Sequence, residues 1–553
     1  MEEEKGLYWA LGPLRVRKNR GFLGYDSSAL SPDETQDRHQ LRSEIDLNSW
    51  NLRLWAIAAS GFLTGSYNLF VANVVNASIS FVYFPDDRGP SLLVNGCTLF
   101  GSVVGQLLFG YLADLFGRTR LYGIELVIVI ISTLGLVFSN TGVSAVITSE
   151  WSSTKARASM IASVFLMQPI GQALAQLINL AVLFGRDRAR SLRTMQCGLD
   201  TAHDFECRQA VDGMWRIVVG VGAIPALVAI AFRFMLPDSG LYNLEVKMKS
   251  RLAMEQAAKI YGMSFSYLDL DRTPDANIGR LDARNGQPQP RPVQFSRANM
   301  YQYFIEEGNW RYLVGTSMTW LILDVALYGF GLDNRAVLAD MWAKIHAVDV
   351  NESLGCWESS IPGGQSLVPT WAEKGLPNWQ TDVTKPCNTI YDVLLDQTKH
   401  YLLTVSIGAN SLTFLIPAEI FPTTYRCFCH GISAAAGKIG SIIAVLMIYG
   451  IKNQYDAVNK QGLIFLLFAG IGAVGAFFSW AYLPDIGRRN AEGKLVNRTL
   501  EELGEGARRA VMEGQTFGAR EKWSDFCSRV RTFGVNRNGS NTTSVNVDDG
   551  TTR

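Results

Sequence analysis

Long apolar blocks set the pattern of this chain. Its apolar residues do not alternate with polar ones at the period of an amphipathic helix or a strand, but run together with few charges. A helix needs about 20 apolar residues to cross the hydrocarbon core of a bilayer. The blocks therefore predict an all-α polytopic membrane protein, with spans at residues 54–84, 92–112, 121–138, 160–184, 215–236, 312–332, 401–421, 431–451 and 463–483.

Polar segments divide these spans into two groups. The segment 237–310 holds nine Lys and Arg residues and the segment 333–398 holds four, so the positive-inside rule places the first in the cytoplasm and the second outside. One segment disagrees, because 185–213 holds five arginines although its position in the chain predicts an outer loop. The predicted organisation is a cytoplasmic N-terminal tail (1–50), an N-terminal helical bundle (51–236), a central cytoplasmic loop (237–310), a C-terminal helical bundle (311–484) with the extracellular loop 333–398, and a cytoplasmic C-terminal tail (485–553).

Composition narrows the possible partners. The 553 residues carry a formal net charge of +1 and 48% of them are hydrophobic. They include no basic stripe interleaved with aromatics, which argues against a nucleic-acid partner. Eight cysteines do not make a disulfide framework, but Cys197 and Cys207 share one predicted outer loop, and Cys356 and Cys387 share another. Disulfides are chemically allowed in such loops, and free thiols remain the alternative.

The two halves of the chain repeat a short pattern. Glu150 is followed by Arg157 and later by Gly171, and Glu419 is followed by Arg426 and later by Gly440. The spacing is seven residues and then fourteen in both halves. Parallel internal repeats of this kind are typical of transporters that bind their substrate between two similar halves.

A charged turn joins the second and third predicted spans. The sequence GYLADLFGRTR, residues 110–120, places one carboxylate and two arginines around a short glycine-containing turn. Such groups form charge-assisted contacts that can hold one conformation and break in another. The segment resembles the signature loop of the major facilitator superfamily, and an ordinary positive-inside loop is the alternative. With the two repeats, it predicts conformational gating residues Asp114, Arg118, Arg120, Glu150, Arg157, Glu419 and Arg426.

A longer motif is more specific. PAEIFPTTYR at 417–426 precedes HGISAAAGKIG at 430–440. These runs resemble the phosphate:proton symporter family of fungi and plants, over residues 50–506. The resemblance implies a major facilitator fold of two helical bundles and secondary active transport of inorganic phosphate, coupled to protons, by alternating access. It also implies a plasma-membrane location, with phosphate, protons and the lipid bilayer as partners and no cofactor.

The same resemblance implies a substrate site between the halves, formed by Gln168, Trp320, Asp324, Tyr328, Asn410 and Lys438. Spacing agrees with part of it, because Trp320, Asp324 and Tyr328 are four residues apart and so share a helix face. Asp324 is the only charge in its predicted span, and charges inside a membrane usually face a cavity. If phosphate enters as H₂PO₄⁻ when Asp324 is protonated, and is expelled when Asp324 loses its proton, this carboxylate couples phosphate transport to proton transport.

Structural roles are the alternatives for these residues. Asp324 could form a structural pair with a cation such as Lys438, while Trp320 and Tyr328 could serve packing or interfacial anchoring.

Other chemistries find no support. Residues 431–438 lack the spacing and the final Ser or Thr of a phosphate-binding loop. Cys427, Cys429 and His430 lie too close together for a metal site and have no second cluster. Neither a nucleophile elbow nor a zinc-hydrolase motif is found, so the chain is not predicted to be an enzyme.

The chain departs from the resembling family in three places. The family has twelve spans. The apolar blocks of this chain are long enough for about ten, because each span needs about 20 residues. The short regions are at Asn140/Thr141 and at Ile407/Gly408, and Gly65 stands where the family has a carboxylate linked to proton entry. A glycerophosphodiester or other phosphate-ester transporter, a non-transporting nutrient sensor and an incomplete gene model are therefore alternatives to the phosphate symporter.

Overall fold

The computed structural model describes the helical body of the chain. The described residues are 51–85, 89–116, 118, 157–199, 203–233, 295–332, 388–401, 409–454, 457–484, 486–489 and 495–507, with short pieces at 6–9, 12–15, 356–357 and 366–367 and single residues at 243, 253, 256, 257 and 379. The predicted span 121–138, the junctions at 140/141 and 407/408, Arg120 and Glu150 all lie outside them.

Helices account for most of the described residues of the first half. They are α2 (Leu52–Tyr83), α3 (Gly89–Phe116), α6 (Arg157–Phe165), α7 (Met167–Arg190), α8 (Asp204–Val221) and α9 (Ala223–Arg233). In this part of the chain, α6 continues into α7 and α8 into α9, so that each pair is one apolar helix long enough to cross a membrane. The predicted spans 54–84, 92–112, 160–184 and 215–236 are confirmed as helices.

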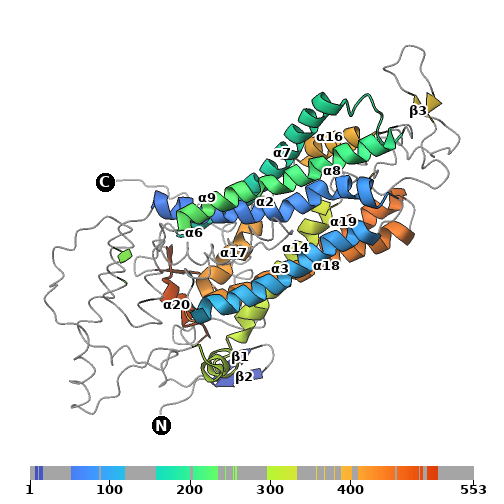
Figure 1. Ribbon diagram of the computed structural model, residues 1–553. Coiled ribbons are helices and arrows are strands. Elements are labelled where there is room, and N and C mark those ends of the chain that lie inside the picture. Colours follow the sequence, from blue (N-terminus) through green and yellow to red (C-terminus); the bar gives the residue numbers. More distant parts are fainter. Residues whose placement is uncertain are drawn as a thin grey trace, which may run out of the picture.

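The second half is also helical. Its helices are α13 (Arg297–Tyr301), η3 (Gln302–Glu306), α14 (Trp310–Leu332), α16 (Ile390–Tyr401), α17 (Ala409–Ile420), α18 (Arg426–Gln454), α19 (Ala457–Tyr482) and α20 (Leu500–Gly504) (Figure 1). The predicted spans 312–332, 431–451 and 463–483 are confirmed as helices, and in this half α18 is described as long and apolar enough to cross a membrane. The block 401–421 is only partly described, and its helix α17 rises about 18 Å, less than a hydrocarbon core.

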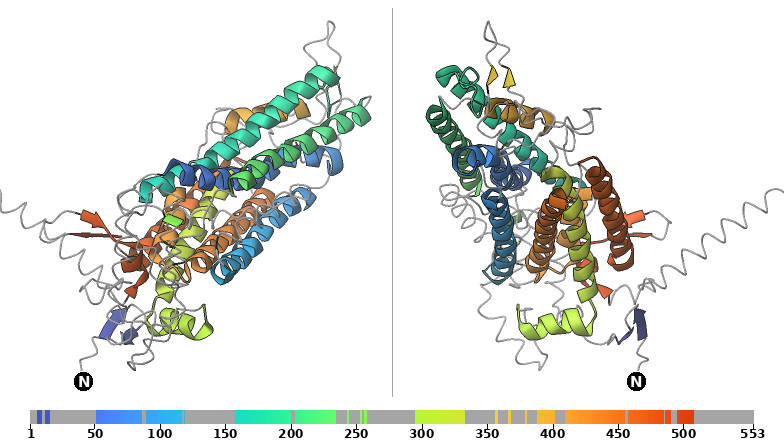
Figure 2. Two further views of the ribbon diagram at one scale, coloured as in Figure 1. Left: turned by 60° about the vertical axis from the view of Figure 1, so that its left-hand side comes forward. Right: turned by 90° about the vertical axis from the view of Figure 1, so that its right-hand side faces the viewer.

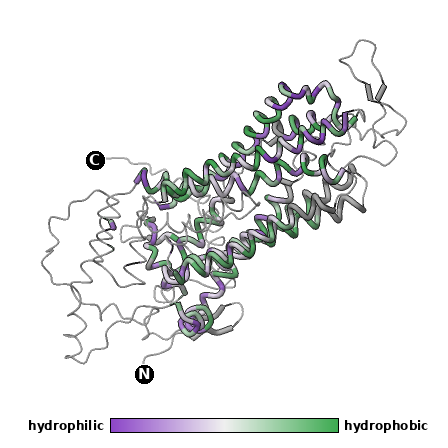
Figure 3. Tube along the Cα trace, in the orientation of Figure 1, coloured by the Kyte–Doolittle hydropathy of each residue, from purple (hydrophilic) through white to green (hydrophobic). Residues whose placement is uncertain are grey.

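Three two-stranded antiparallel sheets accompany the helices. They pair β1 (Gly6–Trp9) with β2 (Gly12–Arg15), β3 (Cys356–Trp357) with β4 (Ser366–Leu367), and β5 (Gly487–Arg489) with β6 (Leu495–Asn497). Apolar residues run along most of each long helix, whereas polar ones gather toward the helix ends (Figure 3). Large apolar side chains such as Phe100, Leu446 and Phe477 are exposed, as expected of a surface in contact with lipid.

Helix α18 lies between α3 and α14, with α19 on the far side of α14 (Figure 2). Glycines permit this close packing. Gly110 of α3 meets Gly431 of α18, and a Cβ atom on Gly110 would stand 2.8 Å from the carbonyl oxygen of Cys427. Farther along α18, a Cβ atom on Gly440 would collide with the backbone of α14 at Leu321. Small residues at helix crossings give membrane helices the dispersion contacts that hold them together.

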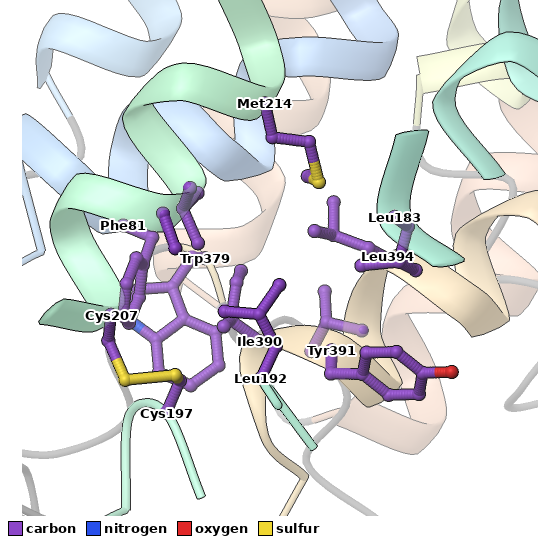
Figure 4. Packing of buried hydrophobic residues seen from close by; sticks show 13 residues of the cluster. Phe81, Leu183, Leu192, Cys197, Cys207, Met214, Trp379, Ile390, Tyr391 and Leu394 are labelled. Carbon is purple, nitrogen blue, oxygen red and sulfur yellow. A yellow bond between two sulfur atoms is a disulfide. The ribbon is translucent and has the colours of Figure 1, made fainter. Parts of the chain in front are cut away.

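A buried apolar cluster closes one end of the molecule, which we call the disulfide end. Phe81 of α2, Leu183 of α7 and Met214 of α8 pack with Trp379 and with Leu394 of α16 (Figure 4). The cluster therefore joins helices of the first half to a helix of the second. The arginine-rich segment 185–213 belongs to this end, where Arg208 pairs with Asp204 at 2.9 Å.

Cys197 and Cys207 form a disulfide inside this cluster, which decides between the two alternatives for that pair. The side chains of Cys356 and Cys387 lie outside the described residues. The peptide N–H of Ile390, at the start of α16, donates to the carbonyl of Cys197 at 3.0 Å. The disulfide loop thus helps to anchor α16 against the first half.

We predict that Cys207→Ser lowers the melting temperature of the purified protein. The disulfide closes a loop with a sequence separation of 10, which in the chain-entropy account is worth about 3 kcal/mol. Cys97→Ser is the control, because Cys97 is an exposed free thiol. Equal melting temperatures for the two variants would contradict a stabilising role.

We also predict that Gly110→Ala destabilises the protein by about 1–3 kcal/mol, because the added methyl group forces α3 and α18 apart. Gly96→Ala is a control on the same helix, since a Cβ atom there meets nothing within 4 Å. Thermal unfolding of the two variants checks the crossing, and a melting temperature of Gly110→Ala as high as that of Gly96→Ala would refute it.

Candidate functional site

A buried polar cluster joins α14 to α18. The Nζ of Lys438 donates to the hydroxyl of Tyr328 at 2.7 Å and lies 3.2 Å from Oδ2 of Asp324. The Oγ of Ser441 donates to the same carboxylate oxygen at 3.3 Å. Asp324 is 1% exposed, Lys438 6% and Tyr328 5%. The structure therefore brings together Asp324, Tyr328 and Lys438, three of the residues predicted to bind substrate.

Local sequence explains this meeting of side chains. Asp324 and Tyr328 are one helical turn apart on α14, and Lys438 and Ser441 are three residues apart on α18, so each pair lies on one face. Gly437 makes room at the crossing, because a Cβ atom there would stand 3.0 Å from Oδ2 of Asp324. The pair of opposite charges that was an alternative reading of Asp324 is present. It gives both charges a partner, which a low-dielectric interior requires.

Trp320 lies where the two halves meet. Its ring packs on Phe414 of α17 at 4.4 Å between centroids and on His430 of α18 at 5.5 Å. The same cluster includes Phe62 of α2 and Phe165 of α6, which belong to the first half. The spacing predicts that Trp320 shares a helix face with Asp324, and the structure adds its ring contacts to Phe414 and His430.

Gln168 and Asn410 are less fully determined. Gln168 is on α7, three residues beyond Phe165, and its backbone carbonyl accepts a hydrogen bond from Oγ of Ser66 at 2.6 Å. The side chain of Asn410 lies outside the described residues. Their participation in a site with Asp324 and Lys438 therefore stays a prediction.

A second polar contact closes the opposite end of the molecule, which we call the latch end. Oδ2 of Asp114, in the last turn of α3, accepts from the peptide N–H of Phe428 at 2.7 Å. Oδ1 of Asp114 lies 3.3 Å from Arg118, which also donates to the carbonyl of Thr423. The carboxylate thus caps the N-terminus of α18, where the partial positive charge of the helix favours an anion. The cap links the first half to the second.

Three of the four repeated Glu and Arg positions are described, and they lie at the latch end as well. Glu419 of α17 is buried, and the charges of Arg157 and Arg426 both act on it. The Nε of Arg426 also donates to the carbonyl of Phe421 at 2.9 Å. The charge of an arginine in the first repeat therefore acts on the glutamate of the second, which the matching spacing of the two repeats did not by itself show.

Helix α2 offers no carboxylate to the site. Where the resembling family has an acidic residue, this chain has Gly65, and the nearby Asn68 donates to the carbonyl of Thr64 at 3.0 Å. The hydroxyl of Tyr67 donates to the carbonyl of Val218 at 2.6 Å. Among the described residues of the membrane helices, Asp324 is a buried carboxylate that pairs with Lys438, and its part in proton coupling stays a prediction.

The ion pair predicts that substitutions of Asp324 and Lys438 have strongly non-additive effects on folding stability. Asp324→Asn and Lys438→Met each leave one buried charge without its partner, and each is expected to cost about 3–5 kcal/mol of folding stability. The double variant should lose much less than the sum. Thermal unfolding of the three variants and the wild type completes the cycle, and additive losses would show that the two groups do not interact.

Comparison with known proteins identifies the family. The profile of the family described as "Sugar (and other) transporter" matches residues 54–273 and 398–493, more than half of the chain. The repressible high-affinity phosphate permease of Neurospora crassa is 30% identical, and the match covers 88% of this chain and 92% of that protein. The inorganic phosphate transporter PHO84 of Saccharomyces cerevisiae is 31% identical over 70% of this chain and 74% of its own length. A solved structure of the proton:xylose symporter XylE aligns with 16% identity and a TM-score of 0.49, covering 82% of this chain and 98% of its own.

The alignments also show that this chain lacks residues that its relatives have. The match to the Neurospora permease runs over 553 positions but includes only 88% of this 553-residue chain, so about one position in eight stands opposite a gap in this chain. The match to PHO84, 447 positions for 70% of the chain, shows a similar deficit. A deficit of this size is expected if the chain has about ten spans where the resembling family has twelve, and that difference stays a prediction because both junctions lie outside the described residues. The chain belongs to the sugar (and other) transporter family of the major facilitator superfamily, a family of membrane transporters rather than enzymes, and the fungal phosphate permeases are among its relatives.

Proposed function

We propose that this chain moves inorganic phosphate across the plasma membrane together with protons, by alternating access between its two halves. The observation that carries the proposal is the buried Lys438–Asp324 pair with Tyr328 beside it. Its position one turn from Trp320, which contacts both halves, gives an anion two hydrogen-bond donors near the interface. The choice of phosphate as the substrate is supported by the relatives that are named as phosphate permeases or transporters.

Binding begins when phosphate joins Asp324 as a partner of the Lys438 ammonium group. Phosphate oxygens accept hydrogen bonds from the Lys438 ammonium group and the Tyr328 hydroxyl, and the ammonium charge then serves two anions instead of one. Two like charges about 4 Å apart repel by about 4 kcal/mol at an effective dielectric constant near 20. Protonation of Asp324 removes this repulsion, so H₂PO₄⁻ and a proton bind favourably together. Loss of the proton restores the pair and helps to expel phosphate.

The two ends of the molecule then serve as gates. We assign the latch end to the cytoplasm and the disulfide end to the outside, with 51–236 and 311–484 as the moving bundles. Opening inward requires Asp114 to leave the N-terminus of α18 and Arg157 to separate from Glu419. Opening outward requires the apolar cluster around Trp379 and α16 to separate. Arg120, Glu150, Gln168 and Asn410 complete the proposed gating and substrate-binding sets.

A non-transporting phosphate sensor is a second candidate. The gap of about one position in eight against the relatives favours it, because parts of those transporters have no counterpart in this chain. A sensor binds phosphate at the same ion pair but does not release it on the other side. Uptake therefore separates the two candidates.

The test is the uptake of radioactive phosphate by cells that lack their own phosphate transporters and express this chain. Wild-type uptake should fall as the external pH rises, because phosphate needs a protonated Asp324. Asp324→Asn, which carries no titratable proton, should abolish this pH dependence when uptake is normalised to the amount of folded protein. Asp212→Asn is a control, since Asp212 belongs to a cluster with Tyr83 and Arg216 near the disulfide end. Unchanged pH dependence in Asp324→Asn would refute the coupling role of this carboxylate.

A further inference from the structure

One face of the continuous helix α6–α7 is directed at the second half. At its inner end, Phe165 packs on Phe414 of α17 with a centroid distance of 4.5 Å. At its outer end, Leu183 packs with Ile390 and Leu394 of α16. Phe165 and Leu183 are eighteen residues apart in the sequence, five full turns of a helix, so the two lie on the same face. Residues between them at the same angle must therefore also face the second half.

Amide side chains occupy this stretch of the face. Gln172, Gln176 and Asn179 all lie within about 40° of the direction of Leu183 at 100° per residue, and Gln168 begins the row. The opposite side of α7 is apolar, where Leu174 and Ile178 pack against α2 and α8. The row of amides thus lies on the side of the helix that carries Leu183, away from this apolar side.

Two of these amides are buried and have no hydrogen-bond partner among the described residues. Gln176 is 1% exposed and Asn179 is 0% exposed. Among the residues that the structure describes, the amide nitrogen and oxygen of both side chains have no hydrogen-bond partner. A buried polar group that makes no hydrogen bond is destabilising, and such groups in native proteins call for an explanation. Leucine would fill the same space without this cost.

The chemistry of the two amides limits what could satisfy them. Each offers N–H donors and a carbonyl acceptor, and neither carries charge. A fully ionised anion could use the donors but would be repelled by the carbonyl oxygens. A hydroxyl group both donates and accepts, so it matches both atoms of each amide. Hydroxyl groups are carried by H₂PO₄⁻ itself and by the polyol part of a phosphate ester.

We infer that Gln176 and Asn179 form a second binding station for hydroxyl groups of the substrate, between the aromatic cluster around Trp320 and the disulfide end. This inference rests on the proposed function in taking a phosphate-bearing substrate as the ligand. Along the helix axis the station begins about 12 Å beyond Gln168, at 1.5 Å per residue. A substrate that enters from the disulfide end therefore meets these amides before it reaches the end of the row at Gln168.

The experiment compares ligand binding to the purified full chain and to the double variant Gln176→Leu/Asn179→Leu. Stabilisation against heat is titrated with two probes at pH 5, inorganic phosphate and glycerol 3-phosphate, because a ligand that binds the folded state raises its melting temperature. Gln209→Leu is the matched control, since Gln209 is an exposed amide on α8. The double variant should bind at least one probe about tenfold more weakly, while its melting temperature without ligand stays the same or rises.

The two probes separate the two sources of hydroxyl groups. Weaker binding of phosphate assigns the station to H₂PO₄⁻, and weaker binding of glycerol 3-phosphate alone assigns it to the polyol of an ester. Unchanged binding of both probes would overturn the inference, as would a wild-type protein that neither probe stabilises. A chain that binds a probe through these amides but takes up no phosphate would refute the proposed transport and leave the station supported.

Discussion

A charge in the interior of a membrane protein is stable only beside an opposite charge or a group that hydrogen-bonds to it. Asp324 and Lys438 meet this requirement through each other, with Tyr328 and Ser441 completing their hydrogen bonds. The same requirement makes the pair sensitive to a third charge. An anion that takes the ammonium group leaves the carboxylate without its partner, and a proton is then the simplest replacement. Substrate and proton are linked in this account because the interior cannot hold an uncompensated carboxylate.

Close helix packing lets this local event reach both ends of the molecule. Helix α18 carries Lys438 in its middle, meets α14 at Gly437 and Gly440, and crosses α3 at Gly431. Its N-terminus is also the group that Asp114 caps at the latch end. A shift of α18 toward or away from α14 is therefore transmitted to the contact between the halves. Tightly packed interfaces of this kind move between discrete arrangements rather than deforming gradually.

The sequence predicted the helices better than it predicted their contacts. Apolar blocks located most spans, since the length and composition of a membrane helix are local properties. Spacing also placed Trp320, Asp324 and Tyr328 on one face. It did not show that Phe414 and His430 would pack on Trp320, or that the charge of Arg157 would act on Glu419, because both depend on which faces of distant helices meet. The amides of α7 could have been noticed as a row of polar residues every three or four positions in an apolar helix. Their burial without partners could be seen only in the fold.

The deficit of residues relative to the phosphate permeases bears most on whether the chain transports. A direct measurement uses the purified full chain in sealed liposomes with an inward proton gradient and radioactive phosphate outside. Proton-coupled transport predicts that phosphate accumulates inside above the external concentration and that a protonophore abolishes the accumulation. Phosphate that only equilibrates across the membrane, or that fails to enter while still binding the protein, would contradict proton-coupled transport by this chain.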